Sequence, residues 1–342
     1  MEKNLALILG GGGAAGNAWL IGVCAGLAER GHDVARLADA VYGTSAGATA
    51  AAQLQGGPSV AELYTATQAE APPALFVESR ANGAGFNEKG GMGGRRGTSG
   101  AGSGGGAGGA GRAGDGGGAG GGPRHDPREV FERMRAIVAA ANSGLDVARG
   151  MGAFALERDP ELAADAAARL EQVASRLPSQ GWPAGHAGMV VVDAESGEVV
   201  VLERGGGATL AEAVDASTAL PGGTSSVPVA GRRFVDGGVY SADNAQLGAG
   251  FGRVLVLSPL TRPEGSEAPR QFEGLRREDA WGTTLASQVA ALKAGGSEVA
   301  VIHPDDEALA VFGSNLMSPG IRPAAAREGR RQGLAAAVGL WA

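Results

Sequence analysis

Residues 5–16 read Leu-Ala-Leu-Ile-Leu-Gly-Gly-Gly-Gly-Ala-Ala-Gly, an apolar run that ends in a cluster of glycines. A second apolar run at 40–42 leads into Gly43-Thr44-Ser45-Ala46-Gly47. Each glycine turn is followed by a helical stretch, at 14–30 and at 46–55. Because strand, turn and helix in series are typical of a parallel sheet, we predict an α/β fold with a central, mostly parallel sheet flanked by helices.

The rest of the chain extends this pattern. The sequence predicts two helices, the second beginning at Asp159-Pro160, then a strand pair, a helix and three more strands, followed by amphipathic helices at the end. In order these elements are 127–142, 159–177, 189–193, 199–203, 208–219, the strand ending at Val235, 253–257 and 298–302. We expect the helices at about 127–177 to cover the active site and to shape an acyl-chain pocket.

A glycine-rich segment divides the chain. About 20 of the 33 residues at 90–122 are glycine, which leaves too few apolar side chains to form a core, so we predict a disordered insertion. We therefore expect one catalytic domain over 4–260, interrupted by this insertion. Residues 261–342 should add a strand and helices that pack on the same domain.

Composition narrows the function classes. The 342 residues carry a net charge of −7, which argues against a nucleic-acid partner. The single cysteine, Cys24, lies in an apolar stretch and is expected to be a buried, inert thiol. No cluster of metal ligands is evident, and we predict neither a metal nor a cofactor.

The N-terminal region resembles a targeting segment in hydropathy alone. Residues 5–28 carry no charge, and Asn17 is their only strongly polar side chain. The glycines at 10–13 interrupt the run, whereas a signal peptide requires about 7–15 continuous apolar residues. We therefore expect a buried strand and helix, and a cytoplasmic protein.

Gly43-Thr44-Ser45-Ala46-Gly47 has the form of a nucleophile elbow. In such a turn between a strand and a helix the serine hydroxyl projects outward, and the flanking glycines allow the chain to fold tightly beneath it. The helix that follows also favours negative charge at its N-terminus. Ser45 is the candidate nucleophile.

The glycines after the first strand allow two interpretations. The N–H groups of Gly11, Gly12 and Gly13 would suit an oxyanion hole. Gly11, Gly13 and Gly16 also fit the dinucleotide-binding pattern G-x-G-x-x-G, which needs an acidic residue at the end of the second strand. Asp39 lies instead at the start of that strand, and Gly43 stands where the acid is needed. The sequence favours the oxyanion hole.

A candidate base comes much later in the chain. Asp236-Gly237-Gly238 follows a predicted strand, so the carboxylate would project from a strand end, although an ordinary turn is the simpler explanation of Asp-Gly alone. The combination of the three motifs resembles the patatin-like phospholipase family, and Ala216-Ser217-Thr218-Ala219-Leu220-Pro221 resembles the third conserved block of that family. The resemblance spans roughly 4–56 and 186–260.

The resemblance implies a three-layer α/β/α fold and a serine lipid acyl hydrolase. It makes Ser45 the nucleophile, Asp236 the proton acceptor, and the turn that contains Gly11, Gly12 and Gly13 the oxyanion hole. The conserved motif glycines would be Gly16, Gly43, Gly47, Gly237 and Gly238. Ala15 is a departure, because the family usually has arginine or lysine there, and its loss would weaken binding of an anionic head group or lower activity.

Two alternatives remain open. His303 follows a predicted strand, and the order Ser45, Asp236, His303 matches an ordinary α/β-hydrolase triad. A catalytically weak binding protein is the other alternative. The expected partner is a lipid or acyl ester. Transient contact with a membrane surface would suit the arginines at 322, 327, 330 and 331, although a solvated helix face explains them more simply.

Overall fold

The computed structural model describes residues 4–69, 127–262 and 274–337, and the predicted disordered insertion at 90–122 lies outside these residues. The first part contains β1 (Leu5–Leu9), α1 (Gly13–Glu29), α2 (Val34–Leu37), β2 (Ala40–Thr44), α3 (Ala46–Gln55) and α4 (Val60–Gln68). The middle part contains α5 (Pro127–Ala140), α6 (Gly144–Leu162), α7 (Ala166–Ala174), β3 (Ala187–Asp193), β4 (Val199–Leu202), α8 (Leu210–Ser217), β5 (Val227–Val229), β6 (Arg232–Asp236) and β7 (Arg253–Leu257). The last part contains α9 (Leu285–Ala294), β8 (Glu298–Ile302), α10 (Asp306–Phe312) and α11 (Arg322–Ala335).

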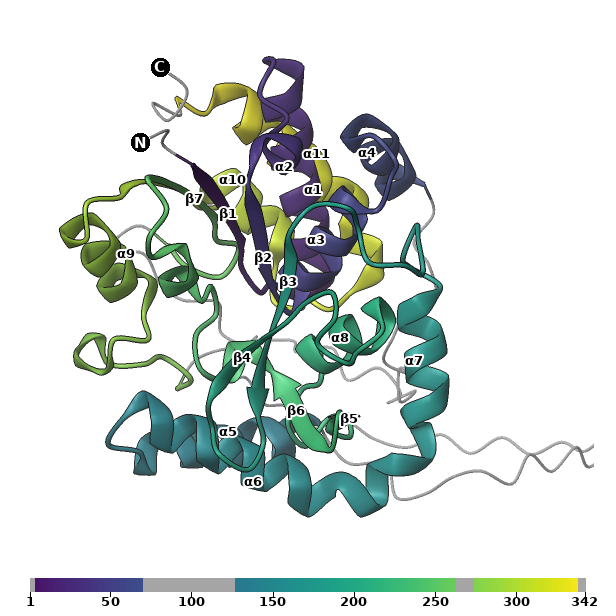
Figure 1. Cartoon of the computed structure of the whole chain (residues 1–342), viewed down its shortest axis with the longest axis vertical. Helices are drawn as coiled ribbons and strands as arrows, with labels where there is room; N and C mark the ends of the chain where they lie inside the picture. Colours follow the sequence, from purple (N-terminus) through teal and green to yellow (C-terminus); the bar gives the residue numbers. More distant parts are fainter. Residues whose placement is uncertain (1–3, 70–126, 263–273, 338–342) are drawn as a thin grey trace, which may run out of the picture. The chain divides into compact units, whose positions relative to one another are not determined.

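The strands form one mixed sheet in the order β5-β6-β3-β2-β1-β7-β8, with β4 also paired to β3. The five strands from β3 to β8 are parallel, and β4, β5 and β6 are antiparallel to their neighbours. Strand β1 is buried at every position, as expected for a parallel strand covered on both faces. Helices flank the sheet (Figure 1), so the predicted α/β fold with a mostly parallel sheet is confirmed.

The pairing of β3 brings two distant strands together. On β3, Val190 pairs with Thr44 of β2 and with β4, while Val191 pairs with Asp236 of β6 and with β4. Since a strand has only two edges and β4 occupies one of them, β2 and β6 share the other edge. They run toward each other along β3, and their last residues face consecutive residues, Val190 and Val191.

Helix α11 is fixed against α1 by close backbone contact. A Cβ atom at Gly22 would lie 2.1 Å from the carbonyl oxygen of Ala326, and one at Gly333 would lie 3.1 Å from the Cα of Gly26. Larger side chains at these glycines would push the helices apart. Gly22 contacts Ala326, and the later Gly26 contacts the later Arg330. The two helices therefore run in the same direction, and their N-termini lie at the same end (Figure 1).

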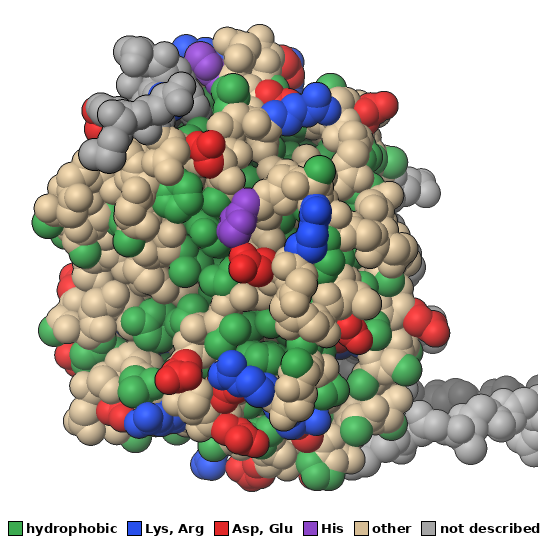
Figure 2. All heavy atoms as spheres, in the orientation of Figure 1, with side chains coloured by type: hydrophobic (Ala, Val, Ile, Leu, Met, Phe, Trp, Pro, Cys, Tyr) green, Lys and Arg blue, Asp and Glu red, His purple; other side chains and the backbone are tan. Residues whose placement is uncertain are grey.

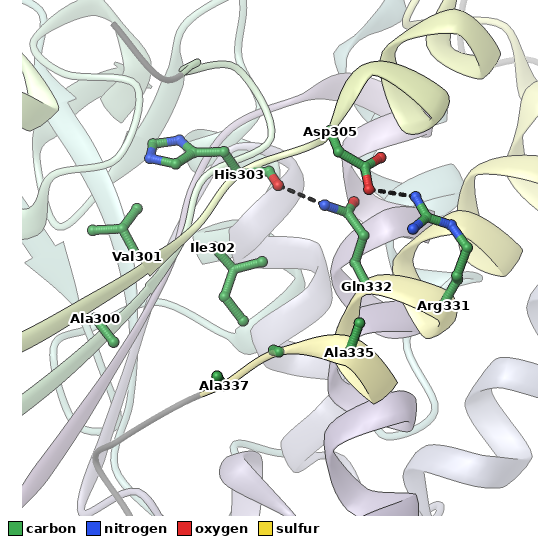
Figure 3. A pocket seen from close by; sticks show the side chains of 10 residues that line it. Ala300, Val301, Ile302, His303, Asp305, Arg331, Gln332, Ala335 and Ala337 are labelled. Carbon is green, nitrogen blue, oxygen red and sulfur yellow. Dashed lines mark hydrogen bonds and ion pairs between the residues drawn. The ribbon is translucent and has the colours of Figure 1, made fainter.

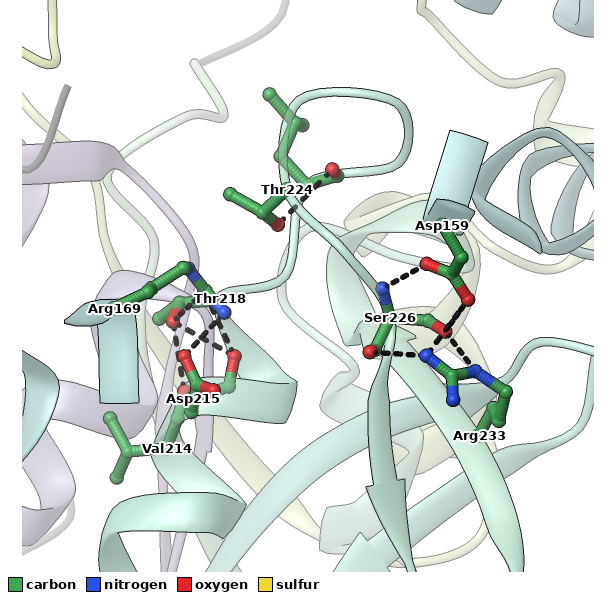
Figure 4. Close-up of polar contacts among 9 residues, drawn as sticks. Asp159, Arg169, Val214, Asp215, Thr218, Thr224, Ser226 and Arg233 are labelled. Atoms are coloured by element: carbon green, nitrogen blue, oxygen red, sulfur yellow. Dashed lines mark hydrogen bonds and ion pairs between the residues drawn. The ribbon is translucent and has the colours of Figure 1, made fainter. Parts of the chain in front are cut away.

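The predicted helix boundary at Asp159-Pro160 is wrong. Helix α6 begins at Gly144 after the N-cap Ser143 and continues through Pro160 to Leu162. Its buried face packs in an apolar cluster, and this tertiary packing outweighs the local tendency of proline to begin a helix. Asp159 does not cap a helix but accepts hydrogen bonds from the backbone N–H and the hydroxyl of Ser226, at 2.7 and 2.6 Å (Figure 4).

Other sequence expectations fall on described residues. Burial raises the pKa of the Cys24 thiol to about 12, which confirms a buried, inert cysteine. Within the described ranges, none of the helices combines the length and the apolar character needed to cross a membrane. On the face shown in Figure 2, acidic and basic side chains are intermixed rather than gathered by sign.

Candidate active site

Ser45 occupies the turn between β2 and α3 in a backbone conformation that is rare for serine. Its φ is 55° and its ψ is −114°, and the side chain is half-buried. The turn depends on close backbone approach, because a Cβ at Gly47 would lie 1.9 Å from the Leu9 carbonyl oxygen and one at Gly43 would lie 2.3 Å from that of Gly47. Such strain at a serine between a strand and a helix is typical of a nucleophile elbow.

A second serine holds the elbow. The backbone N–H of Ser45 donates to the Ser217 hydroxyl at 3.0 Å, and that hydroxyl donates to the Val190 carbonyl at 2.7 Å. Ser217 is fully buried at the end of α8. The sequence marked this residue only as part of a conserved-looking block and gave no sign of its contacts, which depend on the fold.

Asp236 ends β6 beside this elbow and is only 9% exposed. Its side chain accepts a hydrogen bond from the Gly238 N–H at 2.8 Å, and its own N–H donates to Ala219. Burial raises the pKa of the Asp236 carboxyl to about 6, although the Gly238 N–H, a side-chain hydrogen bond with Ser45 and the charge of Arg169 oppose the rise. The carboxylate is therefore a stronger base than an exposed aspartate, and it lies against the serine.

Asn244 connects the two strand ends. It is fully buried and its φ of 53° places it in the left-handed region, which asparagine tolerates better than most residues. Its side-chain amide donates to the Thr44 hydroxyl at 3.1 Å and to the Gly237 carbonyl at 3.2 Å. Nothing in the sequence pattern indicated Asn244, because its partners lie 200 residues before it and 7 residues before it.

The glycine turn after β1 lies next to the serine. A Cβ at Gly11 would lie 3.6 Å from the Cβ of Ser45. The Gly11 N–H is already bound to the Ala242 carbonyl at 2.8 Å, whereas the N–H groups of Gly12 and Gly13 have no partner among the described residues. Gly13 begins α1 with a φ of 61°, which favours glycine. Two unoccupied donors and the N-terminus of α1 thus follow directly after the glycine that lies beside Ser45.

The requirements of a dinucleotide site are not met at β2. Asp39 lies before β2 and its carboxylate accepts from the Leu5 N–H at 2.8 Å, at the opposite end of the strands from the glycine turn. It is therefore far from the position of a ribose ligand. Within the residues that the structure describes, no group of histidine, cysteine or carboxylate side chains is arranged to hold a metal ion.

His303 follows β8, three strand steps from β2 in the sheet. At about 4.8 Å per step this places it roughly 14 Å from the strand that carries Ser45. Its Nδ1 atom lies 3.0 Å from the Thr261 hydroxyl, and burial lowers the pKa of the ring. It lines an open hollow of about 320 Å³ beside α11 (Figure 3). The structure thus brings Asp236, and not His303, to Ser45.

Comparison with known proteins shows the family to which the chain belongs. A family model described as patatin-like phospholipase matches residues 7–247, which is more than half of the chain and includes both Ser45 and Asp236. No curated protein matches the chain at a significant level. The chain therefore belongs to the patatin-like phospholipase family, a family of lipid acyl hydrolases.

Proposed function

We propose that the protein is a serine esterase or phospholipase that cleaves fatty acyl esters with a Ser45–Asp236 dyad. The observation that carries the proposal is the meeting of β2 and β6 at Val190 and Val191 on β3. This register brings a strained serine and a buried carboxylate together from positions almost 200 residues apart. The family match supports lipid acyl hydrolysis in general, and the dyad is our assignment.

The first chemical step transfers the acyl group to the enzyme. Asp236 accepts the hydroxyl proton of Ser45, and the serine oxygen attacks the ester carbonyl to give a tetrahedral oxyanion. Collapse of this intermediate expels the alcohol, which takes the proton from Asp236. In the second step Asp236 removes a proton from water, which attacks the acyl-enzyme to give a second tetrahedral oxyanion. This intermediate collapses by breaking the bond to the serine oxygen, which takes the proton back from Asp236, and the fatty acid is released.

The oxyanion requires donors that are aimed at it before the reaction begins. We assign this role to the N–H groups of Gly12 and Gly13, which follow the glycine beside Ser45 and have no acceptor among the described residues. Gly11 is assigned a positioning role, since its N–H is bound to Ala242 and fixes the turn. Loss of one such donor typically reduces kcat by about 10²–10³-fold.

Covalent labelling tests the nucleophile directly. A fluorophosphonate probe should label the wild-type protein, and Ser45→Ala should lose both labelling and ester turnover. Ser258→Ala serves as a control, because Ser258 also lies just beyond a strand end but is fully buried and bound to Thr261. Labelling that persists in Ser45→Ala would place the nucleophile elsewhere, and a labelled wild type without turnover of any acyl ester would favour a binding protein.

A further inference from the structure

The glycine turn after β1 is packed on both sides by segments that lie beyond the residues matched by the family model. On one side, a Cβ at Gly12 would lie 2.7 Å from the Cβ of Pro259, which follows β7. On the other side, a Cβ at Gly13 would lie 2.9 Å from the Leu316 carbonyl oxygen and 2.5 Å from the sulfur of Met317. The surroundings of the proposed oxyanion donors therefore include side chains that the family motifs do not specify.

Met317 is held in place by its neighbours in the segment between α10 and α11. Leu316 is buried, and its carbonyl accepts a hydrogen bond from the Ala15 N–H in α1 at 3.0 Å. The Met317 N–H donates to the side chain of Asn315 at 3.1 Å. Because these bonds fix the backbone at Met317, its thioether stays beside the start of α1.

Met317 is the most exposed methionine in the part of the chain that the structure describes. It is 42% exposed, whereas Met134 is 6% exposed and Met151 and Met189 are fully buried. Oxidation of a methionine requires that the oxidant reach its sulfur. Burial raises the pKa of the Cys24 thiol to about 12, so the reactive thiolate does not form there at neutral pH. An oxidant should therefore attack Met317 before any other described sulfur atom.

The sulfur of Met317 lies close to donors that have no acceptor. Since a carbon–carbon bond is about 1.5 Å long, the contact at Gly13 places this sulfur no more than about 4 Å from the Gly13 Cα. The N–H groups of Gly12 and Gly13 have no partner among the described residues. A thioether is a weak acceptor and leaves these donors open, whereas a sulfoxide carries a polar oxygen on the same sulfur. Oxidation would thus put an acceptor beside the donors that the oxyanion needs.

Resting on the proposed function, we infer that Met317 is a modification site at which a peroxide reversibly inactivates the enzyme. The sulfur lone pair attacks one oxygen of hydrogen peroxide, so that a sulfur–oxygen bond forms and the oxygen–oxygen bond breaks. The departing hydroxide takes the proton from the transferred oxygen and leaves as water. The sulfur is oxidised by two electrons and the peroxide is reduced. The sulfoxide oxygen then accepts the Gly13 N–H and competes with the ester oxygen for it.

Peroxide treatment of matched variants tests the site. Wild type, Met317→Leu and Met134→Leu are treated with hydrogen peroxide, and kcat on p-nitrophenyl butyrate is compared with that of the same untreated protein. Leucine conserves the apolar volume of methionine and has no sulfur to oxidise. We expect wild type and Met134→Leu to lose at least about tenfold in kcat, because loss of one oxyanion donor costs about 10²–10³-fold. Met317→Leu should retain at least about half of its kcat, since its side chain forms no sulfoxide.

Two further measurements separate this inactivation from other damage. Peptide mass spectrometry should show that Met317 is converted to the sulfoxide before Met134, which is buried. The two methionine sulfoxide reductases, one for each sulfoxide epimer, should restore kcat in the presence of dithiothreitol. Dithiothreitol alone should not restore it, and recovery with dithiothreitol alone would assign the inactivation to Cys24 and overturn the inference.

The remaining outcomes distinguish the modification site from the proposed function. Full conversion of Met317 without loss of kcat would overturn the modification site, and so would equal inactivation of Met317→Leu. Both results would leave the esterase intact. An untreated wild type that hydrolyses no acyl ester would instead overturn the proposed function.

Discussion

Two regions at the carboxyl ends of the strands each contain a side chain suited to acyl transfer. At the junction of β2 and β6, Ser45 and a buried Asp236 converge on consecutive residues of β3. In the hollow beside β8, His303 is bound to Thr261 and lies three strand steps from the serine. The difference shows that two residues at the same end of a sheet do not necessarily form a site. Ser45 and Asp236 come together because the strands that precede or contain them both end beside β3.

The largest loss of turnover is expected when the proposed base, Asp236, is replaced. Asp236→Asn keeps the shape of the side chain and an acceptor for the Gly238 N–H, but it cannot take the proton of Ser45. We expect kcat to fall by about three orders of magnitude, in the middle of the range of about 10²–10⁴-fold for general base catalysis. Steady-state kinetics on a p-nitrophenyl ester measures this effect, and a variant that retains a tenth of wild-type kcat would break the comparison.

Stability provides the control for this variant. The folded-state pKa of Asp236 is about 6, above the value of about 3.9 in an unfolded chain, so ionisation opposes folding as the pH rises through this window. Above pH 6 the cost is on the order of 3 kcal/mol. Asp236→Asn removes it and should melt no lower than the wild type at pH 7.5, so lost activity would not reflect unfolding.

The serine that supports the elbow should have an intermediate effect. Ser217→Ala leaves the Ser45 N–H and the Val190 carbonyl without their partner. We expect a loss of about 1–3 kcal/mol in stability and a fall in kcat of about tenfold to a hundredfold, as the elbow loses its fixed position. Thermal melts and kcat should be measured together, and Ser217→Thr, which retains the hydroxyl, should recover part of kcat.

The pH dependence sharpens the comparison between the two regions. The base must be ionised, so kcat/KM should increase with pH through a midpoint near 6 and then remain level from about pH 7 to about pH 8. Because His303 lies outside the site, His303→Ala should not move this midpoint. A profile that loses its acidic limb in His303→Ala would assign the titration to the histidine.

The smallest effect on kcat is expected from replacing His303, which lines the hollow beside β8. His303→Ala removes a ring that contacts Thr261 and should change kcat by less than about threefold, because no step of the proposed reaction uses it. The measurement is kcat for folded protein, with circular dichroism as the check. If the loss matched that of Ser45→Ala, the protein would use a triad, since members of a triad act as a unit.

The local sequence was sufficient to predict the bounds of several strands and the positions of the tight glycine turn. The strands at 253–257 and 298–302 have the predicted bounds, and Gly43 and Gly47 sit at positions where backbone contact excludes a side chain. Ser45 and Asp236 could be named because short motifs mark them. Their catalytic roles remain a proposal, as do those of the other predicted site residues.

The tertiary structure decided what depends on long-range pairing. The register of β6 on β3 places Asp236 opposite Val191, and no local pattern specifies that register. The same holds for Ser217 and for Asn244, whose hydrogen-bond partners Ser45 and Thr44 lie far away in the sequence. The sequence by itself determined which residues are candidates for the reaction, because a short motif predicts the backbone conformation of the few residues that it contains. Only the fold decided which of them meet, because hydrogen bonds across the sheet fix distances that chain order does not contain.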